Sequence, residues 1–313
     1  MNKFVKRHTN RLKPIFASSV AVALTLLTAS SAQAVRLKVT IENLSPEQGV
    51  FFSPFWLGFH DGSFDTFSPG EKASLPLEIV AEDGITGLES TNPEFAPLVD
   101  LASRFGADLP DPQDTIATLF ATSEPDGIQD IAFANKFGFP QNRESSLFVD
   151  VNPTTHTALS YASMAVPTHD GFVADVDPIR LFSPEGTFVP QQIEIRGADV
   201  FDAGTEVNVE DPSTTPIVFD PPERFFGAVR QGTPEGGVIK PHPLLKEPGQ
   251  GGFLDLPPYV NSDFTRTPNE TLARITIQQV PEASSIFGIL GIGLMFSFGG
   301  LIDRLRSRKS DRV

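Results

Sequence analysis

Two apolar segments at the ends of the chain delimit the part that can fold in water. Residues 1–34 begin with a cluster of Lys and Arg side chains, continue with an apolar run from Ile15 to Leu27, and end in Ala32-Gln33-Ala34. This order is typical of a secretory signal peptide, and the alternative is a buried N-terminal helix. We therefore expect signal peptidase to cleave before Val35.

The other end predicts a membrane anchor. Residues 286–302 are apolar or small, and a basic end follows, Arg304 to Arg312. At about 1.5 Å per residue this segment just spans the roughly 30 Å hydrocarbon core of a bilayer. The basic end is expected on the cytoplasmic side, which places the preceding residues outside. The alternative is a buried core helix with a solvated tail.

A short Pro-Glu motif precedes this segment. Pro281-Glu282-Ala283 stands directly before the apolar run. Residues 280–313 resemble the PEP-CTERM tails of Gram-negative bacteria, whose usual motif is Pro-Glu-Pro. The resemblance implies recognition by an exosortase and cleavage near the motif. We therefore expect transient anchoring in the inner membrane, followed by residence in the cell envelope, on the cell surface or outside the cell.

Composition restricts the function of the middle of the chain. The formal charge of the whole chain is −15. Residues 1–34 carry +5 and residues 284–313 carry +3, so residues 35–283 carry −23. This charge argues against nucleic acid and anionic lipid as partners and favours divalent cations, although acidic surfaces also serve solubility alone. The chain has no cysteine, which excludes thiol nucleophiles, zinc thiolate sites and iron–sulfur clusters.

The patterning of residues 35–279 predicts one all-β domain. Residues 35–41, 193–196 and 273–277 alternate apolar and polar side chains, as half-buried strands do. Similar first and last strands suggest that the two ends of the domain pair. One helix is expected from Asn92 to Gly106. Frequent Pro and Gly, above all in residues 212–258, indicate long loops. We expect an antiparallel β-sandwich with one or two short helices.

Motifs of common enzymes are missing from the sequence. There is no G-x-S-x-G, no H-E-x-x-H and no P-loop. Two His-Asp-Gly turns, at His60-Asp61 and His169-Asp170, leave open one enzymatic alternative, a secreted metal-dependent hydrolase. That alternative requires His60 and His169 to lie close together.

Two loops combine carboxylates with glycine. Asp170 precedes Gly171, and Asp202 and Glu206 flank Ala203-Gly204-Thr205. Carboxylates in such turns, together with backbone carbonyls, supply the hard oxygen ligands that Ca²⁺ prefers. Turns of this kind also occur without an ion. The alternative is therefore that these carboxylates only cap their turns and bind no ion.

These segments carry a family resemblance. Ser163 to Val173 and Asp202 to Glu206 resemble the spondin domain of F-spondin and mindin, and residues 39–44, 53–62 and 84–105 resemble bacterial members. The resemblance implies a C2-like β-sandwich that binds calcium with acidic residues from two loops. Carried over by motif, the ligands are Asp170, Asp202 and Glu206, with Glu206 in place of the usual aspartate. Two further acids that lie close in sequence, Asp175 and Asp177, are candidates to support the site.

The sequence therefore predicts an exported, calcium-binding, non-enzymatic protein. Its expected role is adhesion or association with extracellular matrix or exopolysaccharide, with a surface polysaccharide or matrix component as partner. Animal partners are not carried over, because the animal cysteines and thrombospondin repeats are missing. A structural exopolysaccharide component without a specific ligand is a third alternative.

Overall fold

The computed structural model describes residues 34–104, 109–211, 213–215 and 232–281, and within these segments the chain forms mainly β-strands. The strands are β1 (Val35–Asn43), β2 (Phe51–Phe52), β3 (Phe55–His60), β4 (Ile128–Ala132), β5 (Glu144–Val151), β6 (Ala158–Val166), β7 (Gly171–Ala174), β8 (Ile179–Arg180), β9 (Gln191–Arg196), β10 (Phe201–Asp202), β11 (Lys240–Pro241) and β12 (Thr271–Gln279).

The first sheet has the order β5-β1-β12-β9 and is antiparallel throughout. β1 and β12 lie side by side, with Val39 opposite Ile277. Their alternating apolar side chains are buried, and Leu37, Val39 and Ile277 are at most 1 % exposed. The prediction that the first and last strands pair is thus confirmed, because the period of two places one apolar face of each strand on a shared core.

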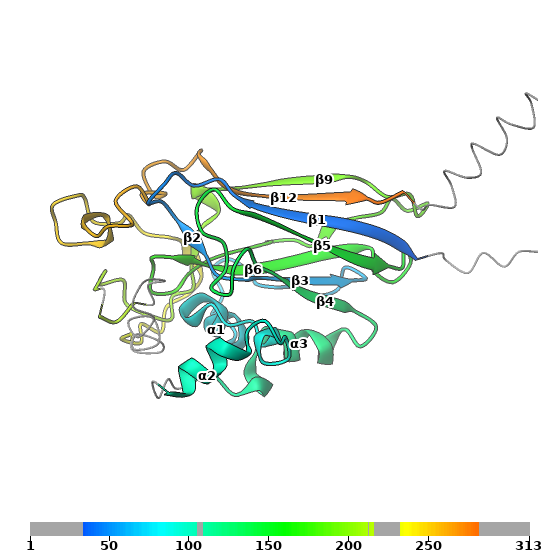
Figure 1. Ribbon diagram of the computed structural model, residues 1–313, viewed down its shortest axis with the longest axis horizontal. Coiled ribbons are helices and arrows are strands. Elements are labelled where there is room, and N and C mark those ends of the chain that lie inside the picture. The colour runs from blue at the N-terminus through cyan, green and yellow to red at the C-terminus, as the bar shows by residue number, and fades with distance from the viewer. Residues whose placement is uncertain (1–33, 105–108, 212, 216–231, 282–313) are drawn as a thin grey trace, which may run out of the picture. The chain divides into compact units, whose positions relative to one another are not determined.

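The second sheet has the order β11-β10-β7-β6-β3-β4, with β2 and β8 also paired to β6. Strand β3, which lies between β6 and the edge strand β4, is buried on both faces. Phe55, Leu57 and Phe59 pack toward the first sheet in one hydrophobic core. Trp56 points the other way, into a second core formed with helix side chains such as Leu77. Figure 1 shows the resulting layers, with β9, β12, β1 and β5 over β6, β3 and β4, and the helices beyond.

In the described part of the chain, three α-helices cover the outer face of the second sheet. They are α1 (Leu75–Asp83), α2 (Ala96–Arg104) and α3 (Ile116–Ser123), and single 3₁₀ turns occur at η1 (Leu88–Ser90), η2 (Pro112–Asp114), η3 (Gly197–Asp199) and η4 (Phe253–Asp255). The sequence predicted α2, although from Asn92, and missed the others. The start and stop of α1 are nevertheless encoded, because the Ser74 side chain accepts a hydrogen bond from the Leu77 N–H and Gly84 ends the helix in the left-handed region.

The expectation of a mostly β protein built from two antiparallel sheets around a common core is confirmed. The sequence predicted one or two short helices, which is fewer than the three α-helices among the described residues. The predicted signal peptide, residues 1–34, falls outside the described residues except for Ala34, and so does the predicted membrane segment 286–302. Among the residues that the structure describes, no helix is long and apolar enough to cross a membrane.

Candidate metal centre

Asp170 lies in the short connection between β6 and β7. Thr168 shapes this turn, because its hydroxyl accepts the Gly171 N–H at 2.9 Å. A Cβ at Gly171 would lie 2.5 Å from the same hydroxyl oxygen, so the turn requires glycine. β7 pairs with β10 so that Gly171 stands opposite Asp202. Strand pairing therefore places Asp170 beside the loop that begins at Asp202.

This loop, residues 202–206, closes around the Asp170 carboxylate. One carboxylate oxygen, Oδ2, accepts the backbone N–H of Thr205 at 2.8 Å and of Glu206 at 3.1 Å. The Thr205 hydroxyl lies 3.2 Å from the same oxygen. Gly204 makes the tight turn possible, since its φ is +69° and a Cβ there would lie 2.6 Å from the Val238 nitrogen. The two predicted loops thus form one unit.

The other oxygen of Asp170, Oδ1, is buried and has no hydrogen-bond partner among the described residues. The residue is 0 % exposed. Burial and, second, the negative charge of Asp202 raise the pKa of Asp170 to about 6, although hydrogen bonds from the 205–206 backbone oppose the shift. A buried carboxylate oxygen without a partner is costly. A cation in this position would supply the missing partner.

Asp202 and Glu206 are held by protein groups. The two Asp202 oxygens accept the Gly204 N–H at 2.7 Å and the Asn208 amide at 2.7 Å, and Lys240 Nζ lies 3.8 Å from Oδ2. Burial raises the pKa of Asp202, and the charge of Lys240 opposes this shift. Glu206 Oε2 lies 3.4 Å from Nδ1 of the buried His169.

The three predicted ligands come from adjoining loops, but the structure does not bring their ligand atoms together as a coordination shell. They are not among the described residues whose ligand atoms all lie within 4.8 Å of one another. Ca²⁺ binds oxygens at about 2.3–2.6 Å, so its ligands lie within about 5 Å of each other. Binding would accordingly require side-chain rotation of Asp202 or Glu206.

Sequence reasoning missed a fourth carboxylate, Glu82 in the last turn of α1. The Thr205 hydroxyl, which lies near Asp170, also hydrogen-bonds to Glu82, and the negative charge of Glu206 acts on Glu82. Burial raises the pKa of Glu82 to about 8. The hydrogen bond from Thr205 opposes this shift, and the charges of nearby carboxylates add to it. No local pattern marks this residue, because only the packing of α1 on the second sheet brings it to the loop.

The two further acids considered as support do not join this site. Asp175 faces β6, where Ser160 Oγ donates to one oxygen at 2.7 Å and the Tyr161 N–H to the other at 2.6 Å. Burial raises the pKa of Asp175 to about 6, as for Asp170. Its oxygens are satisfied by protein, and Asp177 is exposed. Asp175 is therefore a matched comparison for Asp170.

The shared metal site of the hydrolase alternative is contradicted. His60 stands opposite Ala158 at the start of β6, whereas His169 follows Val166 at its end. The eight steps from Ala158 to Val166 span about 26 Å at roughly 3.3 Å each. The two His-Asp pairs therefore belong to opposite ends of the sheet.

His60 is also engaged as a core histidine. It belongs to a group with Asp61 and Glu124 whose ligand atoms lie within 4.8 Å of one another. Its Nδ1 accepts the backbone N–H of Gly62 at 3.1 Å, and Nε2 lies 3.1 Å from the Ser160 hydroxyl. Burial lowers the pKa of His60. Both ring nitrogens have protein partners, so this group offers no ready imidazole ligand.

Comparison with known proteins adds no family to this description. A scan against protein-family models finds no match, and a search of curated protein sequences returns no significant match.

Proposed function

We propose that this protein is an exported, non-enzymatic, calcium-binding domain of the spondin type, with a C2-like sandwich and Asp170, Asp202 and Glu206 as ligands. The observation that carries the proposal is the buried Oδ1 of Asp170, which lacks a partner among the described residues while Oδ2 holds the neighbouring loop. Such an oxygen is the kind of group that a bound cation satisfies.

Calcium suits the arrangement better than a softer metal. The groups at hand are carboxylates from two loops and from α1, and the chain has no cysteine. Ca²⁺ tolerates irregular geometry and takes six to eight oxygens, so backbone carbonyls and water complete a shell that side chains only begin. Mg²⁺ demands near-ideal octahedral geometry and gives up its water reluctantly.

Calcium would have a mechanical role at this end of the sandwich. A bound Ca²⁺ would offset the repulsion between the carboxylates, and the loops 168–171 and 202–206 would then keep a single conformation. A rigid loop end presents a defined surface to a partner, and we propose a surface polysaccharide or matrix component as that partner. In this proposal signal peptidase and exosortase act during export, and inner-membrane anchoring through residues 286–302 is transient.

Thermal melting tests the calcium site. The purified protein is melted in chelator, in Ca²⁺ and in Mg²⁺ at equal ionic strength. We expect a selective rise of Tm with Ca²⁺ that is lost in Asp170→Asn and Asp202→Asn. Asp175→Asn is the matched control, because it removes another buried carboxylate, one whose oxygens the protein already satisfies. Equal calcium shifts in all four proteins would refute the ligand assignment.

A further inference from the structure

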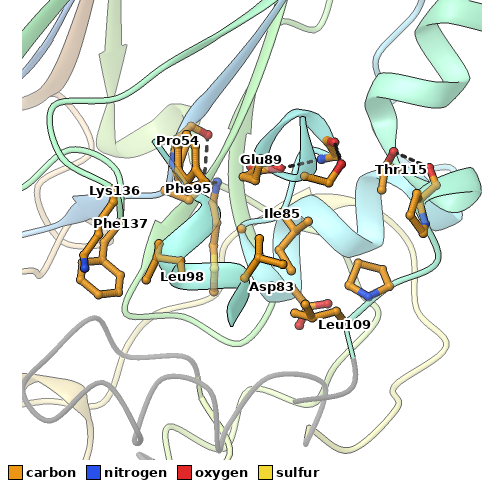
Figure 2. A pocket seen from close by; sticks show the side chains of 18 of the residues that line it. Pro54, Asp83, Ile85, Glu89, Phe95, Leu98, Leu109, Thr115, Lys136 and Phe137 are labelled. Atoms are coloured by element: carbon orange, nitrogen blue, oxygen red, sulfur yellow. Dashed lines mark hydrogen bonds between the residues drawn. The ribbon is translucent and has the colours of Figure 1, made fainter. Parts of the chain in front are cut away.

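A second feature of the molecule is an apolar cavity of about 360 Å³ between the end of α1, helix α2 and the β4–β5 connection. Figure 2 shows its walls, with Phe95 just before α2, Leu98 within α2, Ile85 after α1, and Leu109 and Phe137 on either side. The volume falls within the range of small-molecule sites, which are mostly apolar with a few placed polar groups.

The cavity is separate from the candidate cation site. Its floor includes Met164 and Val166 on β6, both 1 % exposed. Its outer wall is α2, where Val99 is 37 % exposed. No carboxylate assigned to the cation site lines it. Binding in the cavity therefore does not depend on calcium.

Most polar groups along the wall already have protein partners. Glu89 accepts the backbone N–H of Thr86 at 3.0 Å and of Gly87 at 2.8 Å. The Thr115 hydroxyl donates to the Pro112 carbonyl at 2.9 Å. These groups close their own turns and are not available to orient a ligand.

Lys136 is the exception. Its side chain is exposed, its ammonium lies 5.6 Å from the centre of the Phe137 ring, and none of the ion pairs between described residues includes it. Figure 2 places Lys136 at one side of the cavity and Asp83 at the other. A cation at one end and a carboxylate at the other give the cavity a polarity that orients an anionic head group toward Lys136.

We propose that this cavity binds a free medium-chain fatty acid, with the alkyl chain between α2 and β6 and the carboxylate at Lys136. Apolar walls supply the affinity through burial of the chain. The single available ammonium supplies the preference for an acid over a neutral or cationic head group.

Three probes with one tail and different heads test the proposal: decanoate, decan-1-ol and decyltrimethylammonium. Binding to the purified processed protein, without the signal peptide and the apolar segment 286–302, is measured by isothermal titration calorimetry in a detergent-free buffer with chelator, with every probe below its micelle concentration. We expect decanoate to bind most tightly and the quaternary ammonium least. Chelator keeps calcium from precipitating decanoate and keeps this outcome independent of the cation site.

Variants separate the head from the tail. Lys136→Gln is expected to weaken decanoate binding by about two- to fivefold, the range for one exposed charge pair, and to leave decan-1-ol unchanged. Lys136→Glu should reverse the order of decanoate and decyltrimethylammonium. Lys72→Gln, an exposed lysine outside the cavity, is the matched control.

The exposed wall residue Val99 allows the cavity to be filled from outside. We expect Val99→Trp to abolish binding of decanoate and decan-1-ol alike, while circular dichroism and Tm confirm that the variant is folded. The proposal is overturned if wild-type protein binds none of the probes, if the three heads bind equally, or if folded Val99→Trp binds decanoate as well as wild type does.

Discussion

Replacing Asp170 by asparagine should stabilise the protein in chelator at neutral pH, which is opposite to the usual effect of mutating a buried, hydrogen-bonded residue. Asparagine has the shape of the protonated acid and keeps an oxygen for the Thr205 and Glu206 N–H groups. It removes the buried negative charge next to Asp202. The variant therefore resembles wild type with Asp170 protonated.

The magnitude follows from the pKa. Burial and Asp202 raise the pKa of Asp170 from 3.8 to about 6, which corresponds to roughly 3 kcal/mol for ionising the group in the folded state. Because the folded pKa is the higher one, the stability that protonated Asp170 contributes is fully present below pH 3.8. It is lost as the pH rises through 6 and the group ionises in the folded state. We expect Asp170→Asn to exceed wild type by about 1–3 kcal/mol at pH 7.5 in chelator and to match it near pH 4.

Calcium should reverse this order. A ligand at a thousand times its Kd stabilises the folded state by about 4.1 kcal/mol, which exceeds the advantage of about 1–3 kcal/mol expected for the variant in chelator, and only wild type retains the charged ligand. Urea unfolding at pH 4 and pH 7.5, each with calcium and with chelator, gives the four free energies of unfolding for each protein. A variant less stable than wild type in chelator at pH 7.5, or stabilised equally by calcium, would refute the reasoning.

Other predictions concern residues around the same site and the core. Lys240→Gln should raise calcium affinity by about two- to fivefold, because it removes an exposed positive charge 3.8 Å from Asp202; calorimetry showing unchanged affinity would count against a cation near Asp202. Gly204→Ala should cost about 1–3 kcal/mol in urea unfolding, since φ is +69° and Val238 leaves no room for Cβ; wild-type stability would mean that the loop is less tightly held. Leu57→Ala, at 0 % exposure between the sheets, should cost about 2–5 kcal/mol, and a smaller loss would indicate a poorly packed core.

Strands with one buried face were predictable from the sequence. Residues 35–41 and 273–277 alternate because one face of each strand packs on the core and the other meets solvent. β3 and β6 lie between the first sheet and the helices, so both of their faces are buried. Alternation disappears in such strands, and neither was assigned from its pattern.

The candidate site was predictable only as far as local motifs reach. Asp170 and the loop from Asp202 to Glu206 were chosen by family resemblance, and the pairing of β7 with β10 brings these two loops together. Glu82 and Lys240 come from distant segments whose positions depend on tertiary packing. The His-Asp dipeptide, which occurs twice, does not indicate one structural role. His60-Asp61 places His60 in the core, whereas His169-Asp170 lies at the loop end.

Direct counting of bound calcium tests the central claim. The purified protein is dialysed to equilibrium against a defined free Ca²⁺ concentration in excess Mg²⁺, and bound calcium is measured by atomic emission beside protein concentration. We predict one Ca²⁺ per wild-type chain, none in Asp170→Asn, and one in Asp175→Asn. A wild-type chain without calcium, or equal occupancy in wild type and Asp170→Asn, would contradict the account.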